Sequence, residues 1–230
     1  MSLRVRSRLG LADVLTLANA TLGVVAMAAA FTADPGVVAR LILLAAVADG
    51  LDGIVARARG GTAVGPYLDS MADIVSFGTA PAIFVFAVAR DAWVPLSPTG
   101  TPGLYALAVG VPALFVVFSL VRTGLYTVYV GEDETRPGIQ NTLASSILAA
   151  GYLAGVQAVP VVLTATAVLA VLMVAPIPYP KLAARDALVM GVVQVGAILQ
   201  PTLLDRLLPR ILLLAALAYL TLAPWFYWED

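Results

Sequence analysis

The sequence has no cysteine and no histidine among its 230 residues. Without cysteine it has neither disulfides nor thiolate metal ligands. Without histidine it lacks the commonest general base and a usual zinc ligand. Charged residues are scarce as well, at 12% of the chain, whereas an average soluble domain has about 25%. Any acid–base or metal chemistry therefore depends on the carboxylates of Asp and Glu.

Apolar residues dominate what is present. They make up 61% of the chain, and the mean hydropathy is +0.96. This composition predicts an all-α integral membrane protein that crosses the cell membrane several times. A span needs about 17–25 apolar residues, and eight segments qualify as candidates: 11–33, 37–57, 66–89, 104–130, 141–157, 160–175, 184–200 and 208–227. The fifth to seventh are short, so the number of spans falls to six if two of them do not cross.

The distribution of positive charge predicts the orientation. With a cytoplasmic N-terminus and eight spans, the inner side carries nine basic residues: Arg4, Arg6, Arg8, Arg57, Arg59, Arg122, Arg136, Lys181 and Arg185. The outer side carries four: Arg40, Arg90, Arg206 and Arg210. Since basic residues concentrate on the cytoplasmic side, we expect the N-terminus there, with residues 1–10 as a basic interfacial segment. The net charge of −1 gives no indication of nucleic-acid binding, and residues 1–230 read as a single membrane domain.

Four aspartates stand out in the stretch "DGLDGIVARARGGTAVGPYLDSMAD", residues 49–73. Removing a carboxylate from water costs several kcal/mol unless another group compensates it. Asp49 and Asp52 are three residues apart, and Asp69 and Asp73 are four apart, so each pair shares a helix face. The intervening "RARGGTAVG" allows a turn that would bring the two pairs together at the cytoplasmic ends of the second and third spans.

Such a group of carboxylates suits divalent cations. Like charges repel unless a cation neutralises them, and Mg²⁺ or Mn²⁺ couples carboxylates to substrate phosphates. Arg57 beside the group can bind two phosphate oxygens at once. Gly53 and Gly65 leave room for a substrate near the backbone. The simpler alternatives are interfacial aspartates that reach headgroup water and glycines that serve helix packing.

The pattern is similar to the signature of the CDP-alcohol phosphatidyltransferase family. Its residues are Asp49-x-x-Asp52-Gly53-x-x-Ala56-Arg57 and Gly65-x-x-x-Asp69-x-x-x-Asp73. The resemblance implies a core of six transmembrane helices, usually a homodimer, with the site open to the cytoplasm. It also implies transfer of a phosphatidyl-type group from a CDP-linked lipid to an alcohol, with release of CMP.

The resemblance also implies roles for individual residues. Asp49, Asp52 and Asp69 would bind Mg²⁺ or Mn²⁺, most simply as two ions. Asp73 would be a further ligand or the base that takes the proton of the acceptor hydroxyl. The CDP site would be lined by the remaining signature residues, Gly53, Ala56, Arg57 and Gly65. Thr16 and Asn19 in the first span are candidates for polar contacts to the nucleotide, with helix–helix hydrogen bonding as the alternative.

The residues after the signature bear on the acceptor alcohol. "DIVSFGTAPA", residues 73–82, resembles the phosphatidylserine synthase branch, which implies L-serine as the acceptor and makes Ser76 a candidate acceptor contact. Arg122 in "LVRTGLY" would bind an acceptor carboxylate or phosphate, or else reach the inner membrane surface. Two features depart from the branch: Leu125 replaces a frequent arginine, and Gln140 and Asn141 replace a frequent Gly-Leu-Pro segment.

Three alternatives stay open at this point. In the nearest alternative, the acceptor is glycerol 3-phosphate or an inositol phosphate. In the second, the donor is an ether lipid, CDP-archaeol, which the resemblance to archaeal members suggests. The third is of another class, a divalent-cation transporter, although the aspartates lie at span ends and beside an arginine, whereas transporters bind their substrates near the membrane midplane.

Overall fold

The computed structural model describes residues 8–130, 136–180 and 184–227. Nine α-helices are present in these ranges: α1 Leu11–Thr32, α2 Pro35–Arg59, α3 Gly65–Asp73, α4 Ala80–Ala92, α5 Pro102–Leu125, α6 Asn141–Ala154, α7 Val159–Met173, α8 Ala184–Leu199 and α9 Leu203–Phe226. Two π-helical segments, Ile74–Thr79 and Tyr126–Val130, follow α3 and α5. The strands β1, Arg136–Pro137, and β2, Pro178–Tyr179, form a short antiparallel ladder. Most of the basic segment 1–10, including Arg4 and Arg6, and also Lys181, lie outside the described residues.

The helices confirm the predicted all-α membrane fold. Because α3, the π segment and α4 continue as one rod, the described residues form eight rods that match the eight predicted segments closely. By length and apolar composition, four of the rods can cross a membrane: Leu11–Thr32, Gly65–Ala92, Pro102–Tyr129 and Leu203–Phe226. Val159–Met173 is a shorter apolar helix. The protein is therefore a multi-pass membrane protein, and the β1–β2 ladder is an addition that the composition did not predict.

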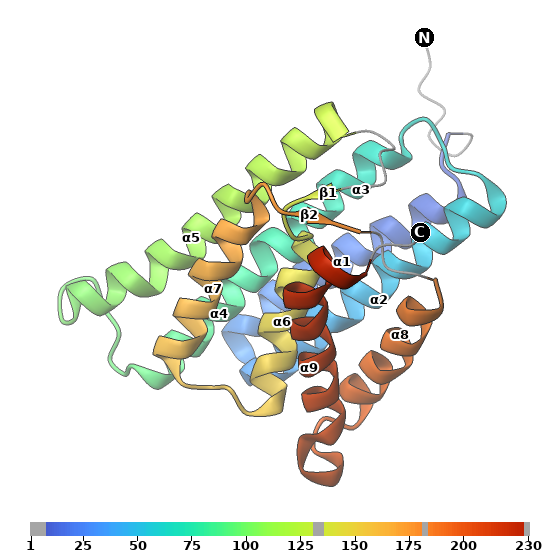
Figure 1. Cartoon of the computed structure of the whole chain (residues 1–230). Coiled ribbons are helices and arrows are strands. Elements are labelled where there is room, and N and C mark those ends of the chain that lie inside the picture. Colours follow the sequence, from blue (N-terminus) through green and yellow to red (C-terminus); the bar gives the residue numbers. More distant parts are fainter. Residues whose placement is uncertain (1–7, 131–135, 181–183, 228–230) are drawn as a thin grey trace.

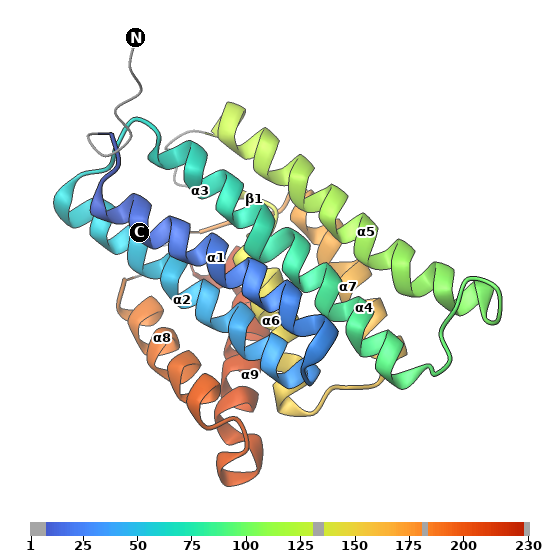
Figure 2. The ribbon, with the colours of Figure 1, turned by 180° about the vertical axis from the view of Figure 1, so that it is seen from behind.

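The rods run up and down through one bundle (Figure 1). Figure 2 shows α1, α2 and the α3–α4 rod side by side, and these helices pack on one another. At one end of the bundle, which we call the site end, α2 finishes and α3 begins. At the other, which we call the far end, lie the connections α1–α2, α4–α5, α6–α7 and α8–α9. The aspartates of both signature halves therefore lie at the same end.

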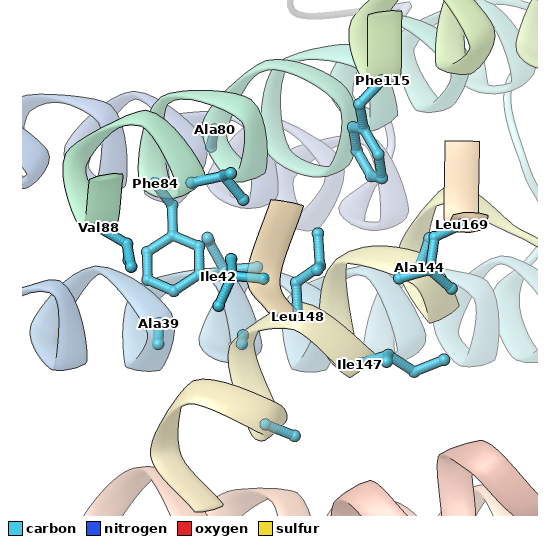
Figure 3. Close-up of a cluster of buried hydrophobic side chains, with 14 of the residues drawn as sticks. Ala39, Ile42, Ala80, Phe84, Val88, Phe115, Ala144, Ile147, Leu148 and Leu169 are labelled. Atoms are coloured by element: carbon cyan, nitrogen blue, oxygen red, sulfur yellow. The ribbon is translucent and has the colours of Figure 1, made fainter. Parts of the chain in front are cut away.

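Small and large apolar side chains alternate in the core. Figure 3 shows Phe84 of α4, Ile42 of α2 and Leu148 of α6 in one cluster of buried side chains. The ring of Phe84 meets that of Tyr152 edge to face, with centroids 5.4 Å apart. Ala39 and other alanines in the same cluster allow the helix backbones to approach closely, as is common between helices in lipid. This core holds α2, α4 and α6 together on the side of the aspartates that leads to the far end.

A buried aspartate connects the turn between α2 and α3 to the start of α1. Asp13 is only 2% exposed. Its Oδ2 accepts hydrogen bonds from the backbone N–H of Gly10 at 2.7 Å and from the hydroxyl of Thr62 at 2.8 Å. The Thr62 hydroxyl in turn accepts from the N–H of Gly65 at 3.1 Å. These bonds fix the position at which α3 begins, and with it the direction of Asp69.

The start of α9 is irregular. Leu204, Asp205 and Arg206 have φ values of 48°, 54° and 64°. L-residues rarely adopt this left-handed conformation, which costs about 1–2 kcal/mol per residue. The regular helix therefore begins after Arg206, close to the predicted start of the last span at residue 208.

Candidate active site

Two helices bring three of the four signature aspartates together. Asp49 lies in the last turns of α2, and Asp69 and Asp73 lie on α3. The turn between them includes Gly60, whose φ of +84° favours glycine. Carboxylate oxygens of Asp49, Asp69 and Asp73 all lie within 4.8 Å of one another. The turn that the sequence allows thus brings Asp49 of the first pair close to both aspartates of the second pair.

Asp49 is half-buried and is held by neutral donors from two other helices. The amide nitrogen of Asn19 on α1 lies 3.5 Å from Oδ1, and the hydroxyl of Thr142 on α6 lies 3.4 Å from Oδ2. Asn19 was a predicted site residue, whereas Thr142 was not. Nothing in the local sequence around Asp49 could identify a partner that is 93 residues away.

Asp52 lies beside the group of three. It is 7% exposed, and its Oδ2 accepts a hydrogen bond from the hydroxyl of Thr16 at 2.6 Å. Asp69 repels it electrostatically, so Asp52 adds to the negative charge of the group. Thr16 also donates to the carbonyl of Ala12 at 3.2 Å. In this structure Thr16 therefore serves the contact between α1 and α2.

Asp73 differs from the others because a guanidinium lies near it. The positive charge of Arg122 on α5 attracts its carboxylate. Arg122 is 8% exposed and lies over the ring of Tyr126, 5.3 Å from the centroid. Tyr126 begins the second π segment. Arg122 is thus buried in the bundle near Asp73.

A divalent cation fits these donors. Mg²⁺ and Mn²⁺ prefer oxygen ligands, and three carboxylates this close repel one another unless a cation neutralises them. Asp73 Oδ1 is buried and has no hydrogen-bond partner among the described residues, so it is available to a cation. Asp49, Asp69 and Asp73 are therefore the residues that could hold a metal ion, with Asp52 alongside.

The small signature residues have distinct surroundings. A Cβ on Gly53 would lie 3.3 Å from Nη1 of Arg57, so the exposed Arg57 side chain folds over this glycine. A Cβ on Gly65 would lie 3.2 Å from Oδ1 of Asp13. Ala56 is half-buried on α2. Gly53 therefore leaves space for a guanidinium, and Gly65 leaves space for the carboxylate that holds the turn.

Ser76 lies in the π segment that follows Asp73. It is fully buried, and its hydroxyl donates to the backbone carbonyl of Asn19 at 2.9 Å. At Gly23 of α1 an added Cβ would lie 2.8 Å from the Cα of Ser76, so only glycine permits this approach. π-Helical turns often occur at functional sites. Here the segment locks α1 to the rod that carries Asp69 and Asp73.

The family can now be assigned. The family model for CDP-alcohol phosphatidyltransferase matches residues 9–195, which include every residue of this site. The chain belongs to the CDP-alcohol phosphatidyltransferase family. It is therefore an enzyme of phospholipid biosynthesis, as the signature indicated.

Three named relatives are similar to this chain over different lengths. The archaetidylserine synthase of Methanothermobacter thermautotrophicus is 27% identical over 181 residues, which cover 77% of this chain and 72% of the relative. The CDP-diacylglycerol–serine O-phosphatidyltransferase of Mycobacterium tuberculosis is 30% identical over 128 residues, 55% of this chain and 40% of the relative. The enzyme of the same name from Mycobacterium leprae is 39% identical over 74 residues, 32% and 25% of the two chains.

Proposed function

We propose that this phosphatidyltransferase transfers a phosphatidyl-type group from a CDP-linked lipid to the hydroxyl of L-serine and releases CMP. The proposal rests on the convergence of Asp49, Asp69 and Asp73, whose carboxylate oxygens lie within 4.8 Å of one another. Their negative charge can bind a divalent cation, and phosphoryl transfer uses such a cation to offset the charge of the phosphates. The names of the relatives, archaetidylserine synthase and serine O-phosphatidyltransferase, support serine as the acceptor.

The reaction forms one P–O bond and breaks another. The serine hydroxyl oxygen attacks the lipid-side phosphorus, the pyrophosphate P–O bond breaks, and CMP leaves with the bonding electrons. Asp73 takes the hydroxyl proton, since its Oδ1 has no hydrogen-bond partner among the described residues. Mg²⁺ or Mn²⁺, most simply two ions bound by Asp49, Asp52, Asp69 and Asp73, would neutralise the pyrophosphate charge. Positioning and charge neutralisation then supply most of the catalysis.

The chain's own residues orient the two substrates on opposite sides of Asp73. Arg57, over Gly53, lies on the nucleotide side, where its guanidinium pairs with phosphate oxygens. Arg122 lies on the acceptor side, where its charge holds the serine carboxylate beside the base. Thr16 and Asn19 keep Asp52 and Asp49 in place by hydrogen bonds.

The remaining elements of the proposal concern setting. The site end faces the cytoplasm, as the basic residues predict, so that CDP-lipid and serine reach it from inside the cell. Two copies assemble as a homodimer, and residues 1–230 act as one membrane domain. The donor is CDP-archaeol or CDP-diacylglycerol, since relatives of both kinds match this chain.

CMP release by the purified protein tests the proposal. CDP-diacylglycerol and CDP-archaeol are each supplied with Mn²⁺ or Mg²⁺ and one acceptor: L-serine, glycerol 3-phosphate or an inositol phosphate. We expect CMP release when L-serine is the acceptor and not with the other two acceptors. The Asp73→Asn variant should lose most of this release. Asp91→Asn, at the far end of α4, is the matched control and should keep full activity. Release with another acceptor would overturn serine as the substrate, and metal flux into liposomes without CMP release would indicate the transporter instead.

A further inference from the structure

The last helix, α9, lies beyond the residues that the family model matches, so the family signature gives it no role. It nevertheless packs on α6, and Figure 1 shows the two helices side by side in the middle of the bundle. Thr142, which contacts Asp49, lies in the first turn of α6. Whatever fixes α6 relative to α9 therefore bears on the active site.

Two tyrosines connect α9 to β2 by reciprocal hydrogen bonds. The hydroxyl of Tyr219 on α9 donates to the carbonyl of Pro180 at 2.5 Å. The hydroxyl of Tyr179 on β2 donates to the carbonyl of Leu220 on α9 at 3.0 Å. Their rings lie 6.2 Å apart, and Tyr179 is 4% exposed. We call Tyr179 and Tyr219 the tyrosine pair.

From β2, hydrogen bonds continue to the start of α6. Tyr179 and Pro178 pair with Arg136 and Pro137 of β1. Immediately after β1, the N–H of Gly138 donates to the carbonyl of Ile177 at 2.9 Å, and that of Ile139 donates to Leu172 at 3.1 Å. Gly138 has a φ of +74°, and an added Cβ would lie 2.1 Å from the carbonyl oxygen of Met173. The backbone is thus confined up to Ile139, two residues before α6 begins.

The first turn of α6 then makes two contacts with the active site. Asn141, 1% exposed, donates from Nδ2 to the hydroxyl of Thr123 at 2.8 Å, next to Arg122. Thr142 donates to Asp49 at 3.4 Å. The first contact lies beside Arg122 and the second lies on the proposed metal ligand Asp49, whereas Arg57 and Gly53, which we assign to the nucleotide, lie farther along α2.

We propose that the tyrosine pair positions the first turn of α6, through the β1–β2 ladder, so that Thr142 and Asn141 keep Asp49 and Arg122 in their reactive arrangement. Tyr179 and Tyr219 are positioning residues, not catalytic ones. The effect on catalysis rests on the proposed function, but the effect on α6 does not. Because Arg57 and Gly53 take no part in these contacts, we expect the tyrosine pair to affect the acceptor more than it affects the CDP-linked lipid.

Hydrogen–deuterium exchange tests the structural half of this inference without any substrate. Tyr219→Phe and Tyr179→Phe keep the ring and remove only the hydroxyl. Each should speed exchange at the amides of Gly138 and Ile139 by about fivefold, which corresponds to the loss of one ordinary hydrogen bond. Tyr105→Phe, near the start of α5 at the far end, is the matched control and should leave these amides unchanged. Unchanged exchange in both variants of the pair would overturn the inference.

Kinetics test the functional half. Tyr219→Phe should lower kcat about three- to tenfold and raise the KM for the acceptor by a larger factor than the KM for the CDP-linked lipid. Combined with Thr142→Val it should cost little more than the more severe single variant, because both act through the same turn. A purely structural role would lower the melting temperature and give independent, multiplicative losses, which would contradict the proposal. If the wild-type protein releases no CMP with serine, the proposed function fails, and the exchange experiment still decides the inference.

Discussion

Two aspartates of the far end, Asp91 and Asp205, and two of the active site, Asp49 and Asp52, have different kinds of partner. At the far end, Asp91 pairs with Arg90 at 2.7 Å and Asp205 pairs with Arg210 at 2.8 Å. In the active site, Asp52 accepts from a threonine hydroxyl and Asp49 from a hydroxyl and an amide. A guanidinium neutralises a carboxylate, whereas a hydroxyl occupies a lone pair and leaves the charge. The site thereby retains negative charge that a cation and a phosphate substrate can use.

Of the substitutions considered, Asp73→Asn should have the largest effect on activity. It removes the proposed base, so CMP release should fall by about 10²–10⁴-fold. The CDP-linked lipid should still bind, because Arg57 and Gly53 are unaffected. Turnover measurements at saturating donor and acceptor check the first expectation, and an equilibrium binding assay checks the second. Near-normal turnover would show that Asp73 is not the base.

Asp49→Asn should weaken metal binding. One of the three clustered carboxylates becomes neutral, and we expect the affinity for Mn²⁺ to fall at least about tenfold. Titration of the substrate-free protein with Mn²⁺, followed by electron paramagnetic resonance, measures this directly. Asp205→Asn at the far end serves as the control and should not alter the titration. An unchanged affinity in Asp49→Asn would remove this residue from the set of ligands.

Gly23→Ala should destabilise the fold beside the site. The added Cβ would lie 2.6 Å from Oγ and 2.8 Å from Cα of Ser76, and such overpacking costs about 1–3 kcal/mol. Gly110→Ala on α5 is the matched control, because its added Cβ meets no atom within 4 Å. That variant should keep its stability or gain about 0.5–1 kcal/mol. Thermal unfolding in detergent compares the two, and equal melting temperatures would argue against close contact between α1 and the π segment.

Arg210→Gln should have the smallest effect. Its ion pair with Asp205 is exposed, with 49% and 82% of the two side chains accessible, and exposed pairs contribute no more than about 1 kcal/mol. We expect the same CMP release and a melting temperature close to that of the wild type. A large loss of CMP release or a large fall in melting temperature would mean that ion pairs at the far end contribute as much to the fold as the hydroxyl contacts of the active site.

Local features of the sequence sufficed to predict the helices and were compatible with the convergence of the aspartates. Apolar runs broken by proline and glycine place the helices within a few residues; the third, predicted at 66–89, extends over Gly65–Ala92. The spacing within each aspartate pair, with a short glycine-containing turn between the pairs, allowed the pairs to meet but did not require it. The catalytic roles of these residues stay predictions.

Features that depend on distant packing could not be predicted. The π segment at Ile74–Thr79 requires one extra residue per turn, which leaves no trace in composition or periodicity. Thr142 reaches Asp49 only because α6 packs against α2. Asp13 resembles an ordinary first-turn aspartate in the sequence, yet it is buried and holds Thr62. For Thr142 and for Asp13 the partner lies on another element of the fold, and the periodicity of the sequence contains no information about it.

The contact between Asp49 and Thr142 has a consequence for biosynthesis. The ribosome adds 93 residues after Asp49 before it reaches Thr142, which takes roughly 5–20 s at ordinary rates of synthesis. Once Asp73 has been added, the nascent chain contains all four signature aspartates but still lacks Thr142, one of the groups that hold Asp49. The candidate active site therefore lacks one of its contacts until α6 has been made and has packed against α2.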